Sequence, residues 1–69
     1  MANLSERLRF LREEKNLNQS DVANAADIVL RTYGRYESGE REPNATVLWK
    51  IADLYGVSVD YLIGRTDTP

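Results

Sequence analysis

The 69-residue sequence contains no cysteine and no histidine. Without cysteine the chain cannot form a disulfide or a thiolate metal site. Without histidine it lacks the commonest general base and the commonest metal ligand. No run approaches the roughly 18 apolar residues of a transmembrane helix, and Met1 to Glu6 show neither the basic start nor the apolar stretch of a signal peptide. These absences predict a cytoplasmic protein with no cofactor, no metal and no membrane association.

The residue groups on which enzymes depend are also missing. Glu13 and Glu14 are adjacent, so on a helix their carboxylates diverge and cannot share a substrate. The sequence has no pairing of a nucleophile with a base, no glycine-rich phosphate loop and no cluster of metal ligands. The chain is therefore not expected to be an enzyme.

What the sequence does contain is enough for one small folded domain. Apolar residues make up 42% of the chain, and the 29% of charged residues are mixed in sign, which argues against disorder. A chain this short buries only about 60% of the surface that it exposes when unfolded. Its net charge is −2, whereas many DNA-binding domains are basic.

Apolar spacing and turn signals predict five short helices and no strand, since no segment alternates with a period of two. Asn3, Asn18, Asn44 and Ser58 are placed as N-caps. The expected ranges are Leu4 to Asn16, Gln19 to about Ala26, Leu30 to Glu37, Ala45 to Tyr55, and Val59 to Ile63. The predicted fold is an all-α, compact five-helix bundle over residues 1–64, with 65–69 as a tail or the start of a linker.

The informative stretch runs from Asn18 to Pro43, where two short helices flank a turn at Asp27 to Val29. The first of them has a small inner face of Val22, Ala23 and Ala26, so the second can cross it closely. Such a crossing lets the second helix project from the surface and enter a DNA major groove about 12 Å wide. This arrangement predicts a helix-turn-helix.

The residues of this predicted helix-turn-helix resemble those of a known family. Leu17-Asn18-Gln19-Ser20-Asp21-Val22-Ala23 and Tyr36-Glu37-Ser38-Gly39-Glu40-Arg41-Glu42-Pro43 look like the phage-repressor helix-turn-helix family of the Cro and xenobiotic-response-element type. The run from Leu48 to Gly64 is similar to the fourth and fifth helices of that family, so the resemblance covers nearly the whole chain. It implies a lambda-repressor-like domain that binds double-stranded operator DNA as a repressor-like transcription regulator.

The resemblance also assigns roles to single residues. It implies a phosphate contact for Gln19, and a buried salt bridge between Arg12 and Glu37, with a phosphate contact as a second role for Arg12. Ser38 and Arg41 are expected to be further phosphate contacts. Tyr33 and Tyr36 occupy the family's inward positions.

With the tyrosines inward, the outward stripe of the recognition helix is Leu30, Arg31, Gly34 and Arg35, because 30/34 and 31/35 are spaced by four. Arginine can bind guanine O6 and N7 with two hydrogen bonds, which favours Arg31 and Arg35 as base readers. Leu30 suits a thymine methyl group, and Gly34 permits a close backbone approach. The alternative is that both arginines only hold phosphates or lie in solvent.

Some features depart from the family pattern. Ile28, Val29 and Leu30 give the recognition helix no side-chain cap, and Asp27 stands where glycine is usual. Residues 19–43 carry three Arg against five Asp or Glu, a local balance of −2. Attraction to phosphates is therefore weak, which leaves room for a role other than DNA binding.

The helix from Ala45 to Tyr55 has apolar residues on several sides. Its expected core stripe is Ala45, Leu48, Ile51, Ala52 and Tyr55. Val47 and Leu54 on its flank, with Tyr61, either complete the rim of the core or form a two-fold dimer interface. In this class of DNA reader a dimer sets two recognition helices about 34 Å apart, so a homodimer on a palindromic operator is expected.

A different function stays open. The acidic balance, with the apolar side chains of Phe10 and Trp49, would also suit an antitoxin-like or anti-repressor module that uses the same fold to hold a protein partner. No specific role follows for Phe10 from the sequence.

Overall fold

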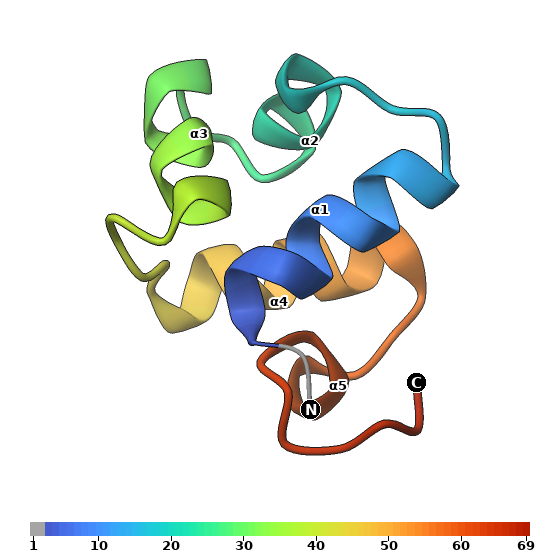
Figure 1. Cartoon of the computed structure of the whole chain (residues 1–69). Helices are drawn as coiled ribbons and strands as arrows, with labels where there is room; N and C mark the ends of the chain where they lie inside the picture. The colour runs from blue at the N-terminus through green and yellow to red at the C-terminus, as the bar shows by residue number, and fades with distance from the viewer. Residues whose placement is uncertain (1–2) are drawn as a thin grey trace.

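The computed structural model describes residues 3–69 as five helices joined by short turns (Figure 1). The helices are α1 (Leu4–Glu14), α2 (Gln19–Ala25), α3 (Leu30–Ser38), α4 (Ala45–Tyr55) and α5 (Val59–Leu62). This architecture confirms the predicted all-α bundle of five helices. The first two residues, which the sequence assigned to the domain, lie outside the described residues. None of the five helices has the length and apolarity needed to cross a bilayer.

The predicted helix bounds are close to those of the structure. α4 matches, and the other helices differ by one or two residues at their ends. The largest difference is at α1, which was expected to reach Asn16 but ends at Glu14. Asn16 has a φ of 57°, in the left-handed region, and a right-handed helix cannot continue through it.

Polar side chains start four of the five helices. Each accepts a hydrogen bond from the backbone N–H three residues ahead, which satisfies one of the free donors of the first turn. These N-caps are Asn3, Asn18, Asn44 and Ser58, as predicted. α3 begins after Val29 without a side-chain cap, so the apolar start noted in the sequence is present in the structure. The first turn of α3 must therefore be stabilised by the packing of α3 on the other helices.

One hydrophobic core joins the five helices. α1 and α2 both pack on α3, α2 also packs on α4, and α5 closes the bundle against α1 and α4. The largest fully buried side chain belongs to Tyr33. The buried apolar residues are Leu8, Leu11, Val22, Ala23, Ala26, Tyr33, Tyr36, Val47, Ile51, Ala52, Tyr55 and Leu62.

The buried side of α4 agrees with the prediction in part. Ile51, Ala52 and Tyr55 are buried as expected, and Leu48 is half-buried against the core. Val47, Ile51 and Tyr55 form its buried stripe at a spacing of four, and Val47 is only 6% exposed. Ala45, which was expected in the core, is exposed. The expectation for Ala45 is wrong: it shares a helix face with the buried Ala52, seven residues later, but it is the first residue of α4 and stands exposed at the end of the helix.

The turn between α2 and α3 fixes how α3 crosses α2. Asp27 adopts a left-handed conformation with a φ of 62°, so the aspartate takes the backbone geometry for which glycine is usual. Ala23 and Ala26 are buried, and the Ile28 N–H donates to the Ala23 carbonyl at 3.0 Å. Small side chains therefore let the two helices approach closely, as a helix-turn-helix requires.

Residues 65–69, expected to be a tail or the start of a linker, fold back on the domain (Figure 1). The Arg65 N–H donates to the Asp60 carbonyl at 2.9 Å, and the Ser58 N–H donates to the Pro69 carbonyl at 3.1 Å. Asp67 forms an ion pair with Arg7 at 3.3 Å. The segment is thus held by contacts at several points.

Candidate nucleic-acid interface

α3 has a buried side and an exposed side. Tyr33 and Tyr36 point inward, with ring centroids 6.5 Å apart in an edge-to-face arrangement, as expected for both. On the outward side the first turn is apolar and open, since Val29 is 67% exposed and Leu30 is 50% exposed. The buried tyrosines anchor the helix, so its outer side is free to meet a ligand.

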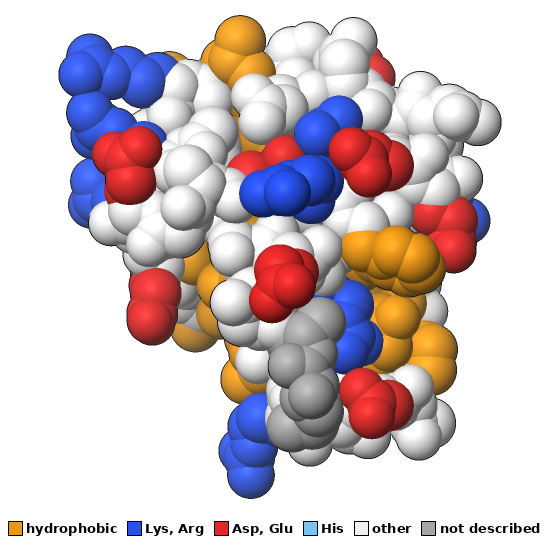
Figure 2. Space-filling view, in the orientation of Figure 1, with side chains coloured by type: hydrophobic (Ala, Val, Ile, Leu, Met, Phe, Trp, Pro, Cys, Tyr) orange, Lys and Arg blue, Asp and Glu red, His pale blue; other side chains and the backbone are white. Residues whose placement is uncertain are grey.

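The four predicted base contacts share this outward region of α3. Leu30 and Arg31 are exposed, while Gly34 and Arg35 are half-buried. Within residues 3–69, no ion pair or hydrogen bond engages the side chain of Arg31 or Arg35. In Figure 2, basic side chains gather at the edge of the molecule that α3 forms in Figure 1.

A buried polar network joins α1, α2 and α3 behind this surface. Arg12 Nε donates to Glu37 Oε2 at 2.6 Å, and Arg12 Nη2 donates to Glu37 Oε1 at 3.0 Å. Arg12 Nη1 donates to the Leu17 carbonyl at 3.1 Å. Gln19 Nε2 also donates to Glu37 Oε1, at 3.2 Å. The ion pair implied by the resemblance is thus present, with Gln19 as a third member.

This network sets the protonation of Glu37, whose side chain is only 4% exposed. Burial alone would raise the pKa of Glu37, but the hydrogen bonds from Arg12 and Gln19, with the charge of Arg12, outweigh it and hold that pKa below its ordinary value. The same contacts with Glu37 raise the pKa of Arg12. Both groups are charged at neutral pH.

The lowered pKa of Glu37 makes the fold sensitive to acid. The folded chain keeps Glu37 ionised to a lower pH than the unfolded chain, where its pKa is about 4.3. The stabilisation that ionised Glu37 gives the folded chain is fully present above the unfolded-state pKa. It is lost as the pH falls through the lower pKa of the folded state. We expect the free energy of unfolding in urea to drop below about pH 4.5, and to drop less in Glu37→Gln. Equal acid sensitivity in both proteins would contradict this origin.

The four predicted phosphate contacts differ in what already engages them. Gln19 and Arg12 are committed to Glu37. The Ser38 hydroxyl has one proton to donate, and two acceptors lie within reach of it: the Arg35 carbonyl at 3.1 Å and the Glu40 carboxylate at 3.2 Å. Arg41 is exposed in the loop after α3. Ser38 and Arg41 therefore lie together at the C-terminal end of α3, whereas Gln19 lies at the start of α2.

Two features of the interior were not predicted from the sequence. Arg7 is buried, with its guanidinium 3.9 Å from the centre of the Tyr61 ring. The hydroxyls of Tyr33 and Tyr55 are also buried, without a hydrogen-bond partner among the described residues. Burial, together with the nearby Glu37 carboxylate, raises the pKa of Tyr33 well above its usual value, and burial raises the pKa of Tyr55 to about 12. Both tyrosines are neutral at physiological pH.

The residues considered for a dimer interface differ in their exposure. Val47 belongs to the core, as the alternative for it stated. Leu54 is 39% exposed, and Tyr61 is half-buried beneath Arg7. Phe10 is exposed on α1, beside Arg7 and Tyr61. Val47 is therefore not accessible to a partner, whereas Leu54 and part of Tyr61 are.

Comparison with known proteins agrees with this geometry. The CTXphi transcriptional repressor RstR of Vibrio cholerae is 38% identical over 64 residues, which are 93% of this chain and 58% of RstR. The chain spans little more than half the length of such relatives. A transcriptional regulator from Listeria innocua superposes with a TM-score of 0.86 at 31% identity, over 90% of this chain and 58% of the other.

The P22 c2 repressor, solved in complex with a synthetic operator, superposes with a TM-score of 0.85 over 91% of this chain and 96% of its own. Its identity of 24% supports a shared fold. The helix-turn-helix family model matches residues 8–62, which include all of α2, α3 and α4. The match confirms the family resemblance. The chain belongs to the helix-turn-helix family of transcriptional regulators.

Proposed function

We propose that the chain binds duplex DNA sequence-specifically, as a regulator of repressor type, with α3 in the major groove. The observation that carries the proposal is the two-sided character of α3. Its inner side is fixed by Tyr33 and by the ion pair of Glu37, while Leu30, Arg31 and Arg35 stand on its outer side without competing partners among the described residues. A DNA target would place the protein in the cytoplasm.

In this proposal the base contacts come from the first two turns of α3. Arg31 and Arg35 each donate two hydrogen bonds to a guanine, and Leu30 packs on a thymine methyl group. A Cβ added to Gly34 would lie 3.7 Å from Gln19 Oε1, an ordinary contact, so the fold does not require glycine there. Because Gly34 has no side chain, a base edge could approach the helix backbone closely at this position.

Phosphate contacts would then position the domain. Arg41 and Ser38 lie at one end of α3, and Gln19 lies at the start of α2. The hydrogen bond to Glu37 fixes the orientation of the Gln19 amide, so its side chain would meet a phosphate already ordered. Arg12 makes three hydrogen bonds within the chain, which favours its structural role over a direct phosphate contact.

Two of the similar proteins support a function of this kind. RstR is a transcriptional repressor, and the P22 c2 repressor was solved on operator DNA. We further propose a homodimer on a palindromic operator. The net charge of −2 weakens attraction to non-specific DNA, and a second copy would supply the affinity that phosphate contacts alone do not.

Selection from a random duplex library tests the proposal. We expect purified protein, at about 50 and 150 mM salt, to enrich a palindrome whose half-sites lie about one helical turn apart. Enrichment of a single half-site would support DNA reading but not the dimer. If no sequence is enriched even at the lower salt, the proposal of DNA binding is wrong, and the protein-interaction alternative gains support.

A further inference from the structure

We propose that the N-terminal half of α4 is a self-complementary surface through which two copies of the chain pair. In this pairing, Trp49 of each copy inserts into an apolar groove beside Leu48 of the other. The inference rests on the proposed function, because it names the partner surface that a dimer on DNA needs. Three observations carry it: an open groove, an exposed indole on the same helix, and a small residue between them.

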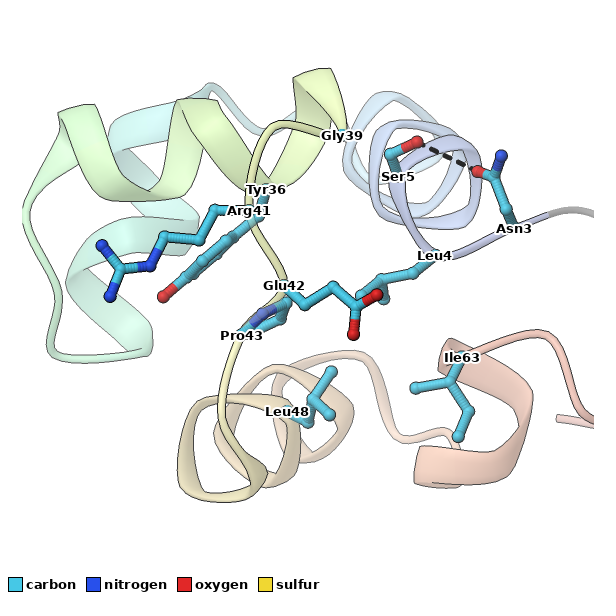
Figure 3. Close-up of a pocket in the computed structure, with 10 residues that line it drawn as sticks. All are labelled: Asn3, Leu4, Ser5, Tyr36, Gly39, Arg41, Glu42, Pro43, Leu48 and Ile63. Atoms are coloured by element: carbon cyan, nitrogen blue, oxygen red, sulfur yellow. Dashed lines mark hydrogen bonds between the residues drawn. The ribbon is translucent and has the colours of Figure 1, made fainter.

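The groove lies between α1, α4 and the end of α5, below the loop that leaves α3 (Figure 3). Leu4, Pro43, Leu48 and Ile63 form its apolar lining, and Figure 3 shows Leu48 and Ile63 pointing into the space between their helices. Its volume is about 520 Å³, within the size range of pockets that accept small ring systems. The side chains of Arg41 and Glu42 border it.

The side chain that would enter this groove is Trp49. It is the chain's only tryptophan and is 57% exposed, although indole is among the side chains that gain most from burial. Tryptophan is also enriched among the residues that dominate binding energy at protein interfaces. Its place on α4 is away from the stripe of Val47, Ile51 and Tyr55 that packs into the core.

Ala45 brings the Trp49 side chain and the groove together. It lies three residues before Leu48 and four before Trp49, so on the helix surface it neighbours both. Ala45 is exposed and carries only a methyl group, so two copies of α4 could cross there closely. A two-fold axis at this crossing makes contacts reciprocal, and each Trp49 then faces the partner's groove.

The charges around the two features are mixed in sign. Asp53 is exposed one turn after Trp49, and Arg41 and Glu42 are both exposed where they line the groove. Asp53 and Arg41 have no ion-pair partner within residues 3–69. When the indole enters the groove, Asp53 of one copy approaches Arg41 of the other, and opposite charges at the rim of an interface favour one register. The pairing also requires the Glu42 carboxylate, which Figure 3 shows over the groove, to turn towards solvent.

The contact is small, which predicts when it forms. A tryptophan side chain buries about 150–250 Å², so two of them with their surroundings fall short of the ~1,200 Å² of a stable interface. The free protein is therefore expected to be mostly monomeric. Pairing becomes strong only when adjacent half-sites on DNA raise the local concentration of the second copy.

Because the indole is unique, its fluorescence tests the inference directly. The probes are the selected duplex with both half-sites and a duplex with one half-site. We expect the emission of Trp49 to shift to shorter wavelength, and acrylamide quenching to fall, on the full site but not on the half-site. The same change should develop without DNA as the protein is concentrated towards millimolar. Unchanged quenching on the full site, with binding shown by anisotropy, overturns the inference.

Matched variants on α4 separate this surface from its neighbour. Trp49→Ala should reduce the affinity advantage of the full site over the half-site roughly tenfold or more, while Leu54→Ala on the other flank should leave it unchanged. Ala45→Glu should block the crossing and act like Trp49→Ala. In each variant the half-site affinity is the internal control for folding and DNA reading. If Leu54→Ala gives the loss and Trp49→Ala does not, the proposed surface is wrong.

The concentration series keeps the two proposals distinguishable. If the chain binds no duplex but Trp49 becomes buried as the protein is concentrated, the proposed function fails and the pairing surface stands. If the chain binds its operator while Trp49 stays open to quencher at every concentration and on the full site, the pairing surface fails alone.

Discussion

Replacing Glu37 with alanine is expected to lower the free energy of unfolding by about 3–5 kcal/mol. The substitution leaves the partly buried Arg12 guanidinium, whose side chain is 16% exposed, without its carboxylate, and it removes the acceptor of the Gln19 amide. Removing one partner of a buried ion pair costs far more than the pair's net contribution, because the remaining charge is desolvated and uncompensated. For a small domain with a total stability near 5 kcal/mol, this loss leaves much of the chain unfolded.

Urea unfolding followed by circular dichroism at pH 7 measures this effect. Glu40→Ala is the matched control, because Glu40 is an exposed glutamate three residues further along the chain. Surface substitutions of this kind usually change stability by less than about 0.5 kcal/mol. If Glu37→Ala is as stable as Glu40→Ala, the network of Arg12, Gln19 and Glu37 does not hold the helices together as the structure implies.

The second large effect is expected on DNA recognition. Arg31→Ala and Arg35→Ala should each reduce discrimination at one defined base pair of the selected operator by about 1–3 kcal/mol, which is roughly 5- to 150-fold. The reason is that each guanidinium is unengaged within the described residues and free to pair with a guanine edge. Stability should change little, because neither side chain belongs to the core.

Anisotropy titrations against the operator and its single-base variants measure this discrimination. Arg65→Ala is the control, since Arg65 is an exposed arginine that follows α5 and lies outside the proposed interface. A phosphate contact would behave differently, with uniform weakening on all sequences and a shallower salt dependence. That uniform pattern in both variants would contradict base reading and favour the alternative that the arginines hold only phosphates.

Much of the fold could be predicted from the sequence because local signals agree with tertiary packing. The N-cap residues Asn3, Asn18, Asn44 and Ser58 mark four helix starts within a residue of where the structure has them. The turn predicted at Asp27 to Val29 is present, and Asp27 takes the left-handed conformation although glycine is usual there. These features depend on a few neighbouring residues, so they are visible in a sequence.

Features that depend on distant partners could not be predicted. α4 is apolar on several sides, so only its contacts with other helices decide that Val47 is buried and Ala45 is exposed. The burial of Arg7 depends on Tyr61, which lies far along the chain and stacks under the guanidinium. A charged side chain with a long apolar stem is compatible with either environment until its partner is known.

The same limit applies to the candidate site. The resemblance implied the pairing of Arg12 with Glu37, but it did not imply that the Gln19 amide also donates to Glu37. That bond depends on how closely α2 approaches α3, which no local pattern encodes. The outward stripe of α3 was easier to predict, because it follows from the helical period once Tyr33 and Tyr36 point inward.

The central claim is that α3 and the start of α2 meet DNA while the opposite side of the bundle does not. Titration of the ¹⁵N-labelled chain with the selected duplex, followed by backbone amide chemical shifts, tests it most directly. We expect the largest shifts in residues 30–38, at 18–20 and at Arg41, further shifts around Trp49 where the two copies pair, and small shifts around Phe10 and 65–67. The largest shifts around Phe10, with α3 unaffected, would contradict the account and place the binding surface on the face of α1 and α5.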